Sequence, residues 1–273
     1  MIDKCEYDGD NGAIVCLDQE KAYNKISHDF LWATLEQFNF PAHLINTFKV
    51  LYKHASTHVL INRELSSPFT INHGVRQGDS PSCYLFDLAI ESLAQLLCNS
   101  DLHGLNIPGL PECLITTLFA DDTTVFLSAA DSYNALLTIL AQWCHISGTQ
   151  FNIPKTTLIP TGTAEYRALV IQSRKLNPTH STIPLNIHIT LDGEPTHTLG
   201  AFVGNNLNQT TIWAPTVEKI DATLKQWNKS HLTLDGHCLI TNMVIGGHTQ
   251  YLTKVQGMPH DVELLLTKHI HLL

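Results

Sequence analysis

Residues 113–127 read CLITTLFADDTTVFL. Two short apolar runs, rich in β-branched and aromatic residues, flank the acidic pair Asp121 and Asp122. Because acidic residues favour turns, the pattern predicts a β-hairpin whose tip carries two carboxylates. An acidic turn is by itself a common solvated feature, and that interpretation stands unless another carboxylate lies close by.

A second strand ends in a carboxylate near the start of the chain. Residues 13–17 (AIVCL) follow the turn dipeptide Asn11-Gly12 and are all apolar, which predicts a buried strand that ends just before Asp18. Taken alone, Asp18 is most simply a helix N-cap. If this strand neighbours the hairpin, Asp18 and Asp121 converge. Carboxylates gathered in this way require a hard divalent cation such as Mg²⁺ or Mn²⁺.

A glycine-rich segment, residues 74–82 (GVRQGDSPS), directly precedes a predicted helix. Its glycines permit close approach of the backbone to a ligand, and its polar side chains offer hydrogen-bond donors. The residues concerned are Gly74, Arg76, Gln77 and Gly78. A plain capping loop, with Ser80 as cap and Pro81 as first helical residue, explains the segment too. The two interpretations are compatible, since a helix N-terminus attracts anions.

The remaining periodicity predicts an α+β region followed by helices. Expected elements are helices near 30–38, 42–54, 82–98 and 131–147, strands at 57–62, 68–72 and 196–203, and an extended segment at 150–160. Residues 161–190 show no clear period, and the pattern is helical from Trp213. We therefore expect an α+β domain over 1–205 and a small helical domain over 206–273.

Composition restricts the classes of protein that fit. The chain of 273 residues carries 16 Lys and Arg against 25 Asp and Glu, a formal charge of −9, which counts against strong nucleic-acid binding by this chain alone. Its seven cysteines are scattered, which argues against a disulfide framework and a zinc site. No apolar run approaches the ~20 residues that span a bilayer, and the N-terminus lacks the pattern of a secretory signal. These features predict a soluble intracellular protein without membrane partners.

Taken in order, three segments resemble motifs A, B and C of reverse transcriptases: DQEKAY (18–23), GVRQGDSPS (74–82) and FADD (119–122). The sequence around them is most similar to the non-LTR (LINE-type) retrotransposon branch. Lys155, with the Gly and Asn that precede it, matches motif D of that branch, and Leu199-Gly200 resembles motif E. Residues 213–259 are similar to its helical thumb.

The resemblance implies a fold and an activity. The fold is a polymerase palm, an antiparallel sheet with helices on one face, followed by a small helical thumb. The activity is RNA-directed DNA polymerisation, in which dNTPs are added to a primer 3′-hydroxyl with two bound Mg²⁺ (or Mn²⁺) ions. Its partners would be an RNA template, a DNA primer and dNTPs, and a working retrotransposon protein would act in the nucleus.

The resemblance also assigns the catalytic groups. Asp18 and Asp121 would hold the two metal ions, and Asp122 would support them. Lys155 would protonate the leaving pyrophosphate. On its residue type alone, Lys155 is as simply a solvated lysine.

The nucleotide and primer contacts follow in the same way. Tyr23 would be the steric gate that excludes a ribose 2′-hydroxyl, although without the motif it reads as a core aromatic residue. Gln77 and Arg76 would contact the incoming nucleotide, and Gly78 would let the template strand approach. Leu199-Gly200 would belong to the primer grip.

Several features depart from the family pattern. The resemblance implies fingers and endonuclease regions upstream, which would belong to a parent polypeptide and complete the enzyme. Asn24, Asp79, Cys83 and His237 are variant residues within the motifs and thumb. They leave open a catalytically inactive palm remnant of a decayed mobile element, with a binding or structural role only. A further alternative is another two-metal nucleotidyl transferase, such as a nucleotide cyclase.

Overall fold

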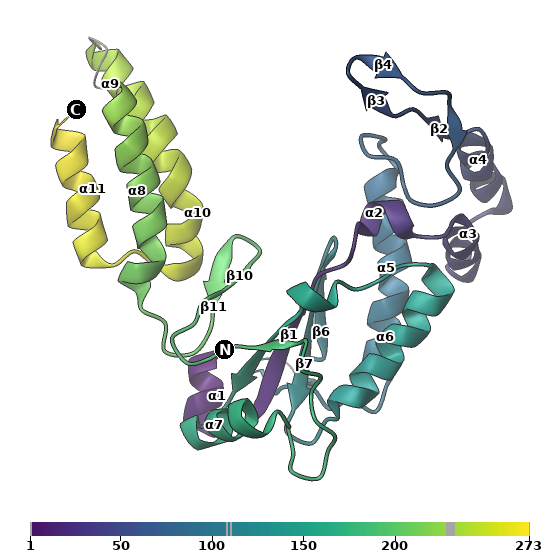
Figure 1. Ribbon diagram of the computed structural model, residues 1–273, viewed down its shortest axis with the longest axis horizontal. Helices are drawn as coiled ribbons and strands as arrows, with labels where there is room; N and C mark the ends of the chain where they lie inside the picture. The colour runs from purple at the N-terminus through teal and green to yellow at the C-terminus, as the bar shows by residue number, and fades with distance from the viewer. Residues whose placement is uncertain (1, 108, 110, 228–232, 273) are drawn as a thin grey trace. The chain divides into compact units, whose positions relative to one another are not determined.

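The structure is a computed structural model that describes residues 2–107, 109, 111–227 and 233–272. The chain divides into two compact units, Met1–Ile189 and Thr190–Leu273, each with its own apolar core (Figure 1). The expected domain boundary at residue 205 stays a prediction. The structure groups the strands of 196–203 with the helical unit.

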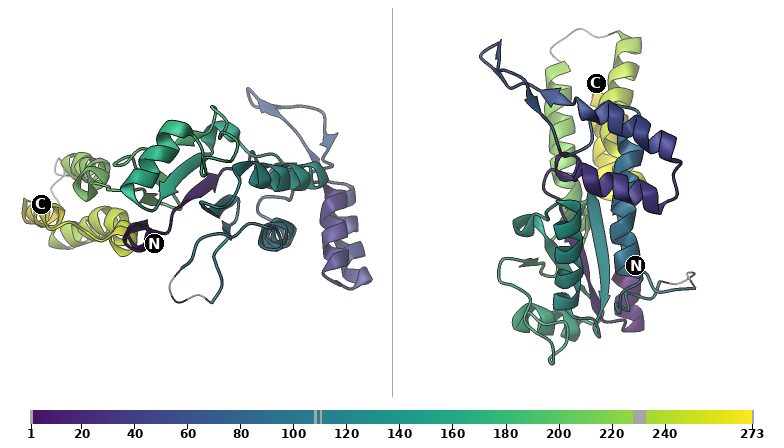
Figure 2. Two further views of the ribbon diagram at one scale, coloured as in Figure 1. Left: turned by 90° about the horizontal axis from the view of Figure 1, so that it is seen from below. Right: turned by 90° about the vertical axis from the view of Figure 1, so that its right-hand side faces the viewer.

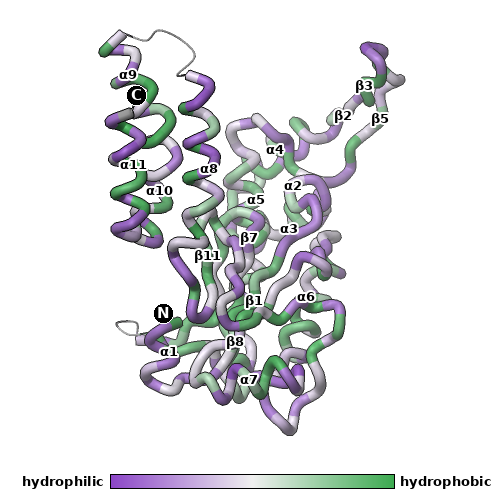
Figure 3. The backbone as a smooth tube through the Cα atoms, turned by 60° about the vertical axis from the view of Figure 1, so that its left-hand side comes forward, coloured by the Kyte–Doolittle hydropathy of each residue, from purple (hydrophilic) through white to green (hydrophobic). Residues whose placement is uncertain are grey.

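In the described part of the first unit, five strands form one sheet in the order β6-β7-β1-β8-β9. They are β6 (Thr116–Phe119), β7 (Asp122–Ser128), β1 (Gly12–Leu17), β8 (Thr157–Thr161) and β9 (His188–Ile189). Neighbouring strands are antiparallel except for β8 and β9, which run parallel. The uniformly apolar β1, green in Figure 3, is the third of the five strands in this order, because only a central strand has neighbours along both edges.

Three helices pack on one face of this sheet: α3 (His28–Gln37), α5 (Ser82–Cys98) and α6 (Tyr133–Ser147). Helices α5 and α6 run side by side (Figure 1, Figure 2). Their buried residues join alternate residues of β1, β7 and β8 in a single core. Its largest members include Leu31, Leu35, Phe86, Leu93, Leu136 and Trp143. The α+β palm architecture expected from the sequence is confirmed.

Shorter elements complete the first unit: α1 (Ile2–Asp8), α2 (Ala22–Lys25), α4 (Ala42–Lys53), the 3-10 turn η1 (Ile153–Lys155) and α7 (Ala164–Ser173). Helix α7 falls where no element was expected. Its buried face includes Arg167, whose guanidinium donates to the carbonyl oxygen of Gly162. A charged residue on the buried face conceals the helical period, which explains why the pattern did not reveal this helix.

The two strands expected at 57–62 and 68–72 form a broken hairpin instead. One ladder pairs β2 (Ser56–Thr57) with β5 (Phe69–Thr70), and another pairs β3 (Leu60–Ile61) with β4 (Glu64–Leu65). The expected turn is confirmed, because Asn62 and Arg63 between β3 and β4 both have positive φ. The hairpin projects away from the sheet in every view (Figure 1, Figure 2).

The second unit combines one hairpin with helices. Its elements are β10 (Thr196–Thr198), β11 (Ala201–Val203), α8 (Gln209–Trp227), α9 (Leu234–Ile240), the π-helical turn η2 (Thr241–Gly246), α10 (Gly247–Gln256) and α11 (His260–Leu272). Polar and apolar turns alternate along the helices (Figure 3), and their apolar sides meet around Trp213 and Ile220. No helix among the described residues of either unit is long and apolar enough to cross a membrane.

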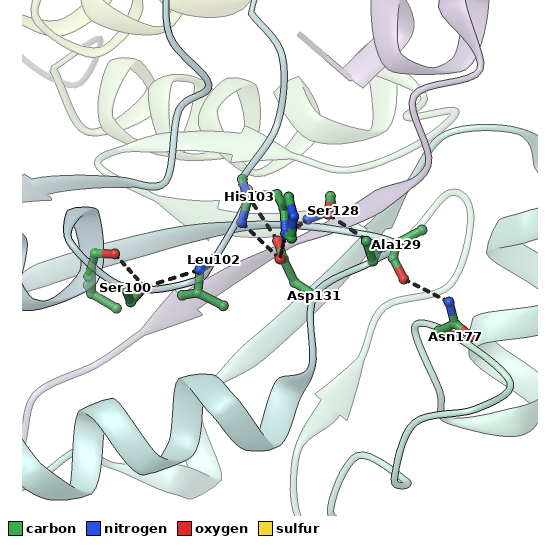
Figure 4. A network of polar contacts seen from close by, with 10 residues as sticks. Ser100, Leu102, His103, Ser128, Ala129, Asp131 and Asn177 are labelled. Atoms are coloured by element: carbon green, nitrogen blue, oxygen red, sulfur yellow. Dashed lines mark hydrogen bonds and ion pairs between the residues drawn. The ribbon is translucent and has the colours of Figure 1, made fainter.

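A buried carboxylate, that of Asp131, connects two segments of the first unit by hydrogen bonds (Figure 4). Asp131 accepts hydrogen bonds from the backbone N–H groups of His103, Gly104 and Ser128, and from the His103 ring at 2.8 Å. Burial by itself would raise the pKa of Asp131, but these donors outweigh burial and hold the pKa below its ordinary value. The loop after α5 is thereby fixed to the end of β7.

Candidate active site

The residues that carry the predicted carboxylates lie at one edge of the sheet. Leu17 of β1 pairs with Thr123 of β7, so continuing the antiparallel register sets Asp18 opposite Asp122. Leu17 and Thr123 are buried, whereas Asp18 is half-buried and Asp122 is exposed. Since side chains alternate between the faces of a sheet, Asp18 and Asp122 share the open face. The condition that the sequence left open, that these two strands are neighbours, is met.

The turn that carries Asp121 is tight. Phe119 pairs with Asp122, which leaves Ala120 and Asp121 as a two-residue loop. Ala120 has φ of +52°, a left-handed conformation that a residue with a Cβ adopts at some cost. The backbone therefore holds the exposed Asp121 in a defined position at the hairpin tip.

A residue that the sequence analysis missed lies beneath the carboxylates. Gln19 is only 4% exposed, and its amide nitrogen lies 3.4 Å from the Thr123 hydroxyl, so it bridges the ends of β1 and β7. The alternation in β1 carries the signal, because Leu17 and Gln19 point inward when Asp18 points outward. The N-cap interpretation of Asp18 is wrong, since α2 begins only after Lys21.

Lys155 lies beside Asp18. Its ammonium group is 3.4 Å from Asp18 Oδ2, while the lysine side chain remains 67% exposed. The backbone fixes this approach, because the N–H of Asn152 donates to the carbonyl oxygen of Asp18 at 2.7 Å. Lys155 is therefore a largely solvated lysine that also forms an ion pair with Asp18.

Tyr23 lies on α2 and is partly buried, and its side chain is held in a defined position. Its ring stacks on Phe86 with centroids 4.4 Å apart and planes 15° apart. Partial burial raises the pKa of the Tyr23 hydroxyl, and the nearby Cys83, Asp87 and Asp121 raise it further. The hydroxyl therefore lies within the electrostatic field of the hairpin tip, with its ring plane set by α5.

The glycines of the 74–82 loop have different surroundings. A Cβ on Gly74 would lie 2.6 Å from the carbonyl oxygen of Tyr23, and Gly74 N–H donates to Ile26. Gly74 thus permits close approach to its own chain, and it also lines a cavity, so the expectation that its backbone approaches a ligand stays a prediction. Gly78, with φ of +94°, has nothing within 4 Å of a built Cβ. The backbone at Gly78 therefore faces open space.

The donors of this loop point to different neighbours. The Arg76 guanidinium donates to the carbonyl oxygen of Leu51 at 2.5 Å and lies 5.2 Å from the centre of the Tyr52 ring. It also forms an ion pair with Asp79 at 3.4 Å. Arg76 is therefore held toward α4. Gln77 is exposed and lines a cavity of about 390 Å³ that also includes the Arg76 side chain.

The start of α5 also differs from the expectation. The cap position falls on Pro81, which makes no side-chain cap hydrogen bond, and the helix begins at Ser82. The assignment of Ser80 as cap and Pro81 as the first helical residue is therefore wrong by one position.

The three carboxylates act on different neighbouring groups. Asp18 faces Lys155, the charge of Asp121 acts on Tyr23, and that of Asp122 acts on Cys16. Burial raises the pKa of Cys16 to about 11, against a hydrogen bond from Thr124, and the charge of Asp122 contributes to the rise. Among the residues that the structure describes, no three His, Cys, Asp or Glu side chains form a group that could hold a metal ion. Carboxylate oxygens are ligands that suit Mg²⁺, and one of them, on Asp18, already attracts the Lys155 ammonium group. The residue types therefore fit such an ion, although the three side chains are not gathered around one point.

The predicted primer-grip residues lie in the second unit. Leu199 and Gly200 form the two-residue loop between β10 and β11, with φ of +49° and +76°. Two consecutive positive φ values are typical of a type I′ hairpin turn. Leu199 is 45% exposed, so its side chain is accessible at the tip of this turn.

Sequence comparison identifies the family. The pattern of the family described as reverse transcriptase (RNA-dependent DNA polymerase) matches residues 3–181. The chain therefore belongs to the reverse transcriptase family. The match covers nearly all of the first unit and does not extend to the second.

The curated relatives come from retrotransposons. An uncharacterised 149 kDa protein of transposon TX1 from Xenopus laevis is 36% identical over 119 residues, which are 44% of this chain and 9% of that protein. A Pol polyprotein of a type-1 R2 element from Popillia japonica is 25% identical over 226 residues, 80% of this chain and 34% of that protein. These relatives confirm the resemblance to the non-LTR branch. The chain spans about a third or less of their length.

Among solved structures, a telomerase from Candida albicans in complex with a fragment of telomeric RNA matches with a TM-score of 0.44. The two sequences are 16% identical, and the match covers 95% of this chain and 40% of the telomerase chain.

Proposed function

We propose that this chain is the polymerising core of a longer retrotransposon polyprotein, which adds dNTPs to a primer 3′-hydroxyl under the direction of an RNA template. The observation that carries the proposal is the register that sets Asp18 opposite Asp122 on the open face, with Asp121 in the adjoining turn. Family membership supplies the reaction class.

In this proposal Asp18, Asp121 and Asp122 hold two divalent ions, Mg²⁺ or Mn²⁺. Such ions lower the pKa of an attacking hydroxyl and neutralise charge on a triphosphate. Gathering the three carboxylates around such ions requires rotation about their side-chain torsions. The backbone places the three residues at one edge of the sheet, and rotation of side chains alone could not bring them there.

The other residues position the reactants, which is the main contribution of a protein to phosphoryl transfer. The Tyr23 ring, fixed on Phe86, presents a flat surface under the sugar and leaves no room for a 2′-hydroxyl. Gln77 is exposed on the loop and binds the nucleotide. Arg76 donates a hydrogen bond to the carbonyl oxygen of Leu51 and so stabilises the conformation of the loop. Lys155 gives a proton to the departing pyrophosphate.

The second unit is the thumb in this proposal, and Leu199-Gly200 contacts the primer strand. Nuclear action follows if the parent element copies itself into chromosomal DNA. The regions that complete the enzyme, fingers and endonuclease, belong to the same parent polypeptide.

A second candidate function is a palm remnant that binds nucleic acid without turnover. It is favoured by the absence of a preformed group of metal ligands among the described residues, and by the formal charge of −9. The two candidates differ in turnover, not in fold.

Primer extension on poly(rA)/oligo(dT) with dTTP tests the proposal, with Mg²⁺ or Mn²⁺, for this chain alone and joined to its upstream regions. We expect the joined polypeptide to incorporate dTMP, and Asp18→Asn and Asp121→Asn each to reduce incorporation by at least about 10³-fold. Asp101→Asn, an exposed carboxylate elsewhere in the same unit, is the matched control. Undiminished incorporation in either site variant contradicts the assignment. If the joined polypeptide binds the hybrid but incorporates dTMP with neither cation, the chain is a remnant without turnover.

A further inference from the structure

The turn between β10 and β11 is attached to helix α10 by a tyrosine that no motif includes. The Tyr251 hydroxyl donates to the carbonyl oxygen of Leu199 at 2.5 Å. A Cβ built on Gly200 would lie 2.9 Å from Cε1 of the same ring. The ring therefore occupies the space that a side chain at position 200 would need, so a Cβ there would displace the Tyr251 ring from the turn.

A glutamine from the same helix holds the next part of the hairpin. The Gln256 amide donates to the carbonyl oxygen of Phe202 at 2.9 Å and accepts from the Phe202 N–H at 3.2 Å. Phe202 pairs with His197 one step beyond the closing pair of the turn, so its backbone groups point away from β10. The Gln256 amide thus satisfies both groups on the outer edge of β11, as a neighbouring strand would.

The side chain of Phe202 completes the attachment. It packs on the apolar core of the second unit, whose centre is the fully buried Trp213. The Trp213 indole N–H donates to the carbonyl oxygen of Gly257, immediately after α10 ends. Hairpin and helix end are therefore fixed to the same core, and α10 cannot shift without carrying the turn along.

These contacts all reach the hairpin from its helix side. The Leu199 side chain at the tip stays 45% exposed, and Gly200 is exposed as well. Two positive-φ residues held in this way form a rigid, accessible tip on a helical unit, which is a suitable surface against which to fix one strand of a nucleic-acid hybrid.

We propose that Tyr251 and Gln256 are positioning residues that hold the β10–β11 turn on α10, so that hairpin and helix grip the primer strand as one body. The inference rests on the proposed function and deepens it, because it assigns the support of the primer contact to residues outside the matched motifs. Neither residue touches the reacting atoms.

The role predicts a local effect. Tyr251 is 53% exposed, and Tyr251→Phe keeps the ring over Gly200 while removing one hydrogen bond. The fold of the unit then persists, and only the turn gains freedom. A purely structural residue would instead lower the melting temperature and leave the primer contact of the folded molecules unchanged.

Photo-crosslinking tests the inference without requiring turnover. The full chain is bound to an RNA–DNA hybrid whose primer ends in 4-thiothymidine, irradiated, and mapped by mass spectrometry. We expect an adduct within residues 196–203, and a yield about fivefold lower in Tyr251→Phe, the effect of one lost hydrogen bond. Tyr7→Phe, an 89% exposed tyrosine in the first unit, is the control and should leave the yield unchanged. An equal yield in Tyr251→Phe, or no adduct at the turn in the unmodified chain, overturns the inference.

Amide exchange at residues 199–203 gives a second measurement. Gln256→Ala should accelerate exchange at Phe202 about fivefold or more, because it removes the acceptor of that N–H. Asp18→Asn separates the two proposals, since it should abolish incorporation and retain the adduct. A joined polypeptide with Asp18 unmodified that forms the adduct but never incorporates dNTPs refutes the polymerase proposal and leaves the positioning role intact.

Discussion

The Lys155 ammonium lies 3.4 Å from Asp18 Oδ2, and both groups are accessible to solvent. The contact joins the end of β1 to the short turn η1, which the chain reaches more than a hundred residues later. The Lys155 ammonium group therefore lies beside the carboxylate that would bind a divalent ion, and the two cations would compete for Asp18.

Replacing Lys155 should change metal binding as well as activity. In Lys155→Met the competing ammonium is gone, so Mn²⁺ should bind the substrate-free chain about two- to fivefold more tightly, the size of a surface ion pair. Incorporation in the joined polypeptide should slow at the same time, because the proton donor is lost. Titration followed by the electron paramagnetic resonance of Mn²⁺ measures the affinity.

Lys49→Met is the matched control, because Lys49 forms an exposed pair of similar length, 3.3 Å, with Glu36 on the same unit. Its affinity for Mn²⁺ should equal that of the unmodified chain. Weaker Mn²⁺ binding in Lys155→Met would show that the lysine supports the site and does not compete with the ion.

Shortening Tyr23 should relax sugar discrimination. In Tyr23→Val the flat ring on Phe86 is lost and a ribose 2′-hydroxyl gains room, so relative incorporation of rNTPs should rise roughly 10- to 100-fold. Tyr23→Phe keeps the ring and should keep the discrimination. Competition between labelled dTTP and UTP in the joined polypeptide measures the ratio, and an unchanged ratio in Tyr23→Val would remove Tyr23 from the nucleotide site.

Cys83 offers a chemical test of the same site. Its thiol is exposed and lies close to the Tyr23 hydroxyl. Iodoacetamide should therefore label Cys83, and a bound hybrid with dNTP should slow that reaction about tenfold or more by covering it. Cys113, also exposed, is the internal control and should react at a constant rate. Cys16 should stay unlabelled at neutral pH, since burial raises its pKa to about 11. Equal labelling of Cys83 with and without ligand would contradict the placement.

The Asp131 network predicts a dependence of stability on pH. Its hydrogen bonds hold the folded-state pKa of Asp131 below the unfolded value of about 3.9, so they stabilise the fold fully above that pH and are lost as the pH falls through the folded value. Asp131→Asn replaces a carboxylate oxygen by an NH₂ group, which cannot accept hydrogen bonds from the backbone N–H groups. The substitution should therefore lower the free energy of unfolding by about 1–3 kcal/mol at pH 7. The difference from the unmodified chain should shrink below about pH 4.

Urea unfolding at pH 3, 4 and 7 measures this difference for the two chains. The exposed Asp101→Asn is the control and should unfold like the unmodified chain at each pH. A difference that stays constant down to pH 3 would show that the charge of Asp131 does not contribute.

The elements that carry the site follow from local sequence patterns alone. Alternation and apolar runs fixed the hairpin around Asp121 and the buried strand before Asp18, because those patterns are local and their physical cause lies within a few residues. The ordered motifs indicated the family, and the comparisons confirm it. Helix α7 was not predicted, because its buried face contains an arginine whose partners lie outside the helix.

The contacts between distant residues, by contrast, become visible only in the folded chain. The pairing of Asp18 with Lys155, the packing of Gly74 on Tyr23, and the attachment of Gly200 to Tyr251 each join segments distant in sequence. Local propensity carries no information about such pairs, since they depend on strand register and on helix packing set by the whole core. Residue types could therefore be read from the chain, but their partners could not.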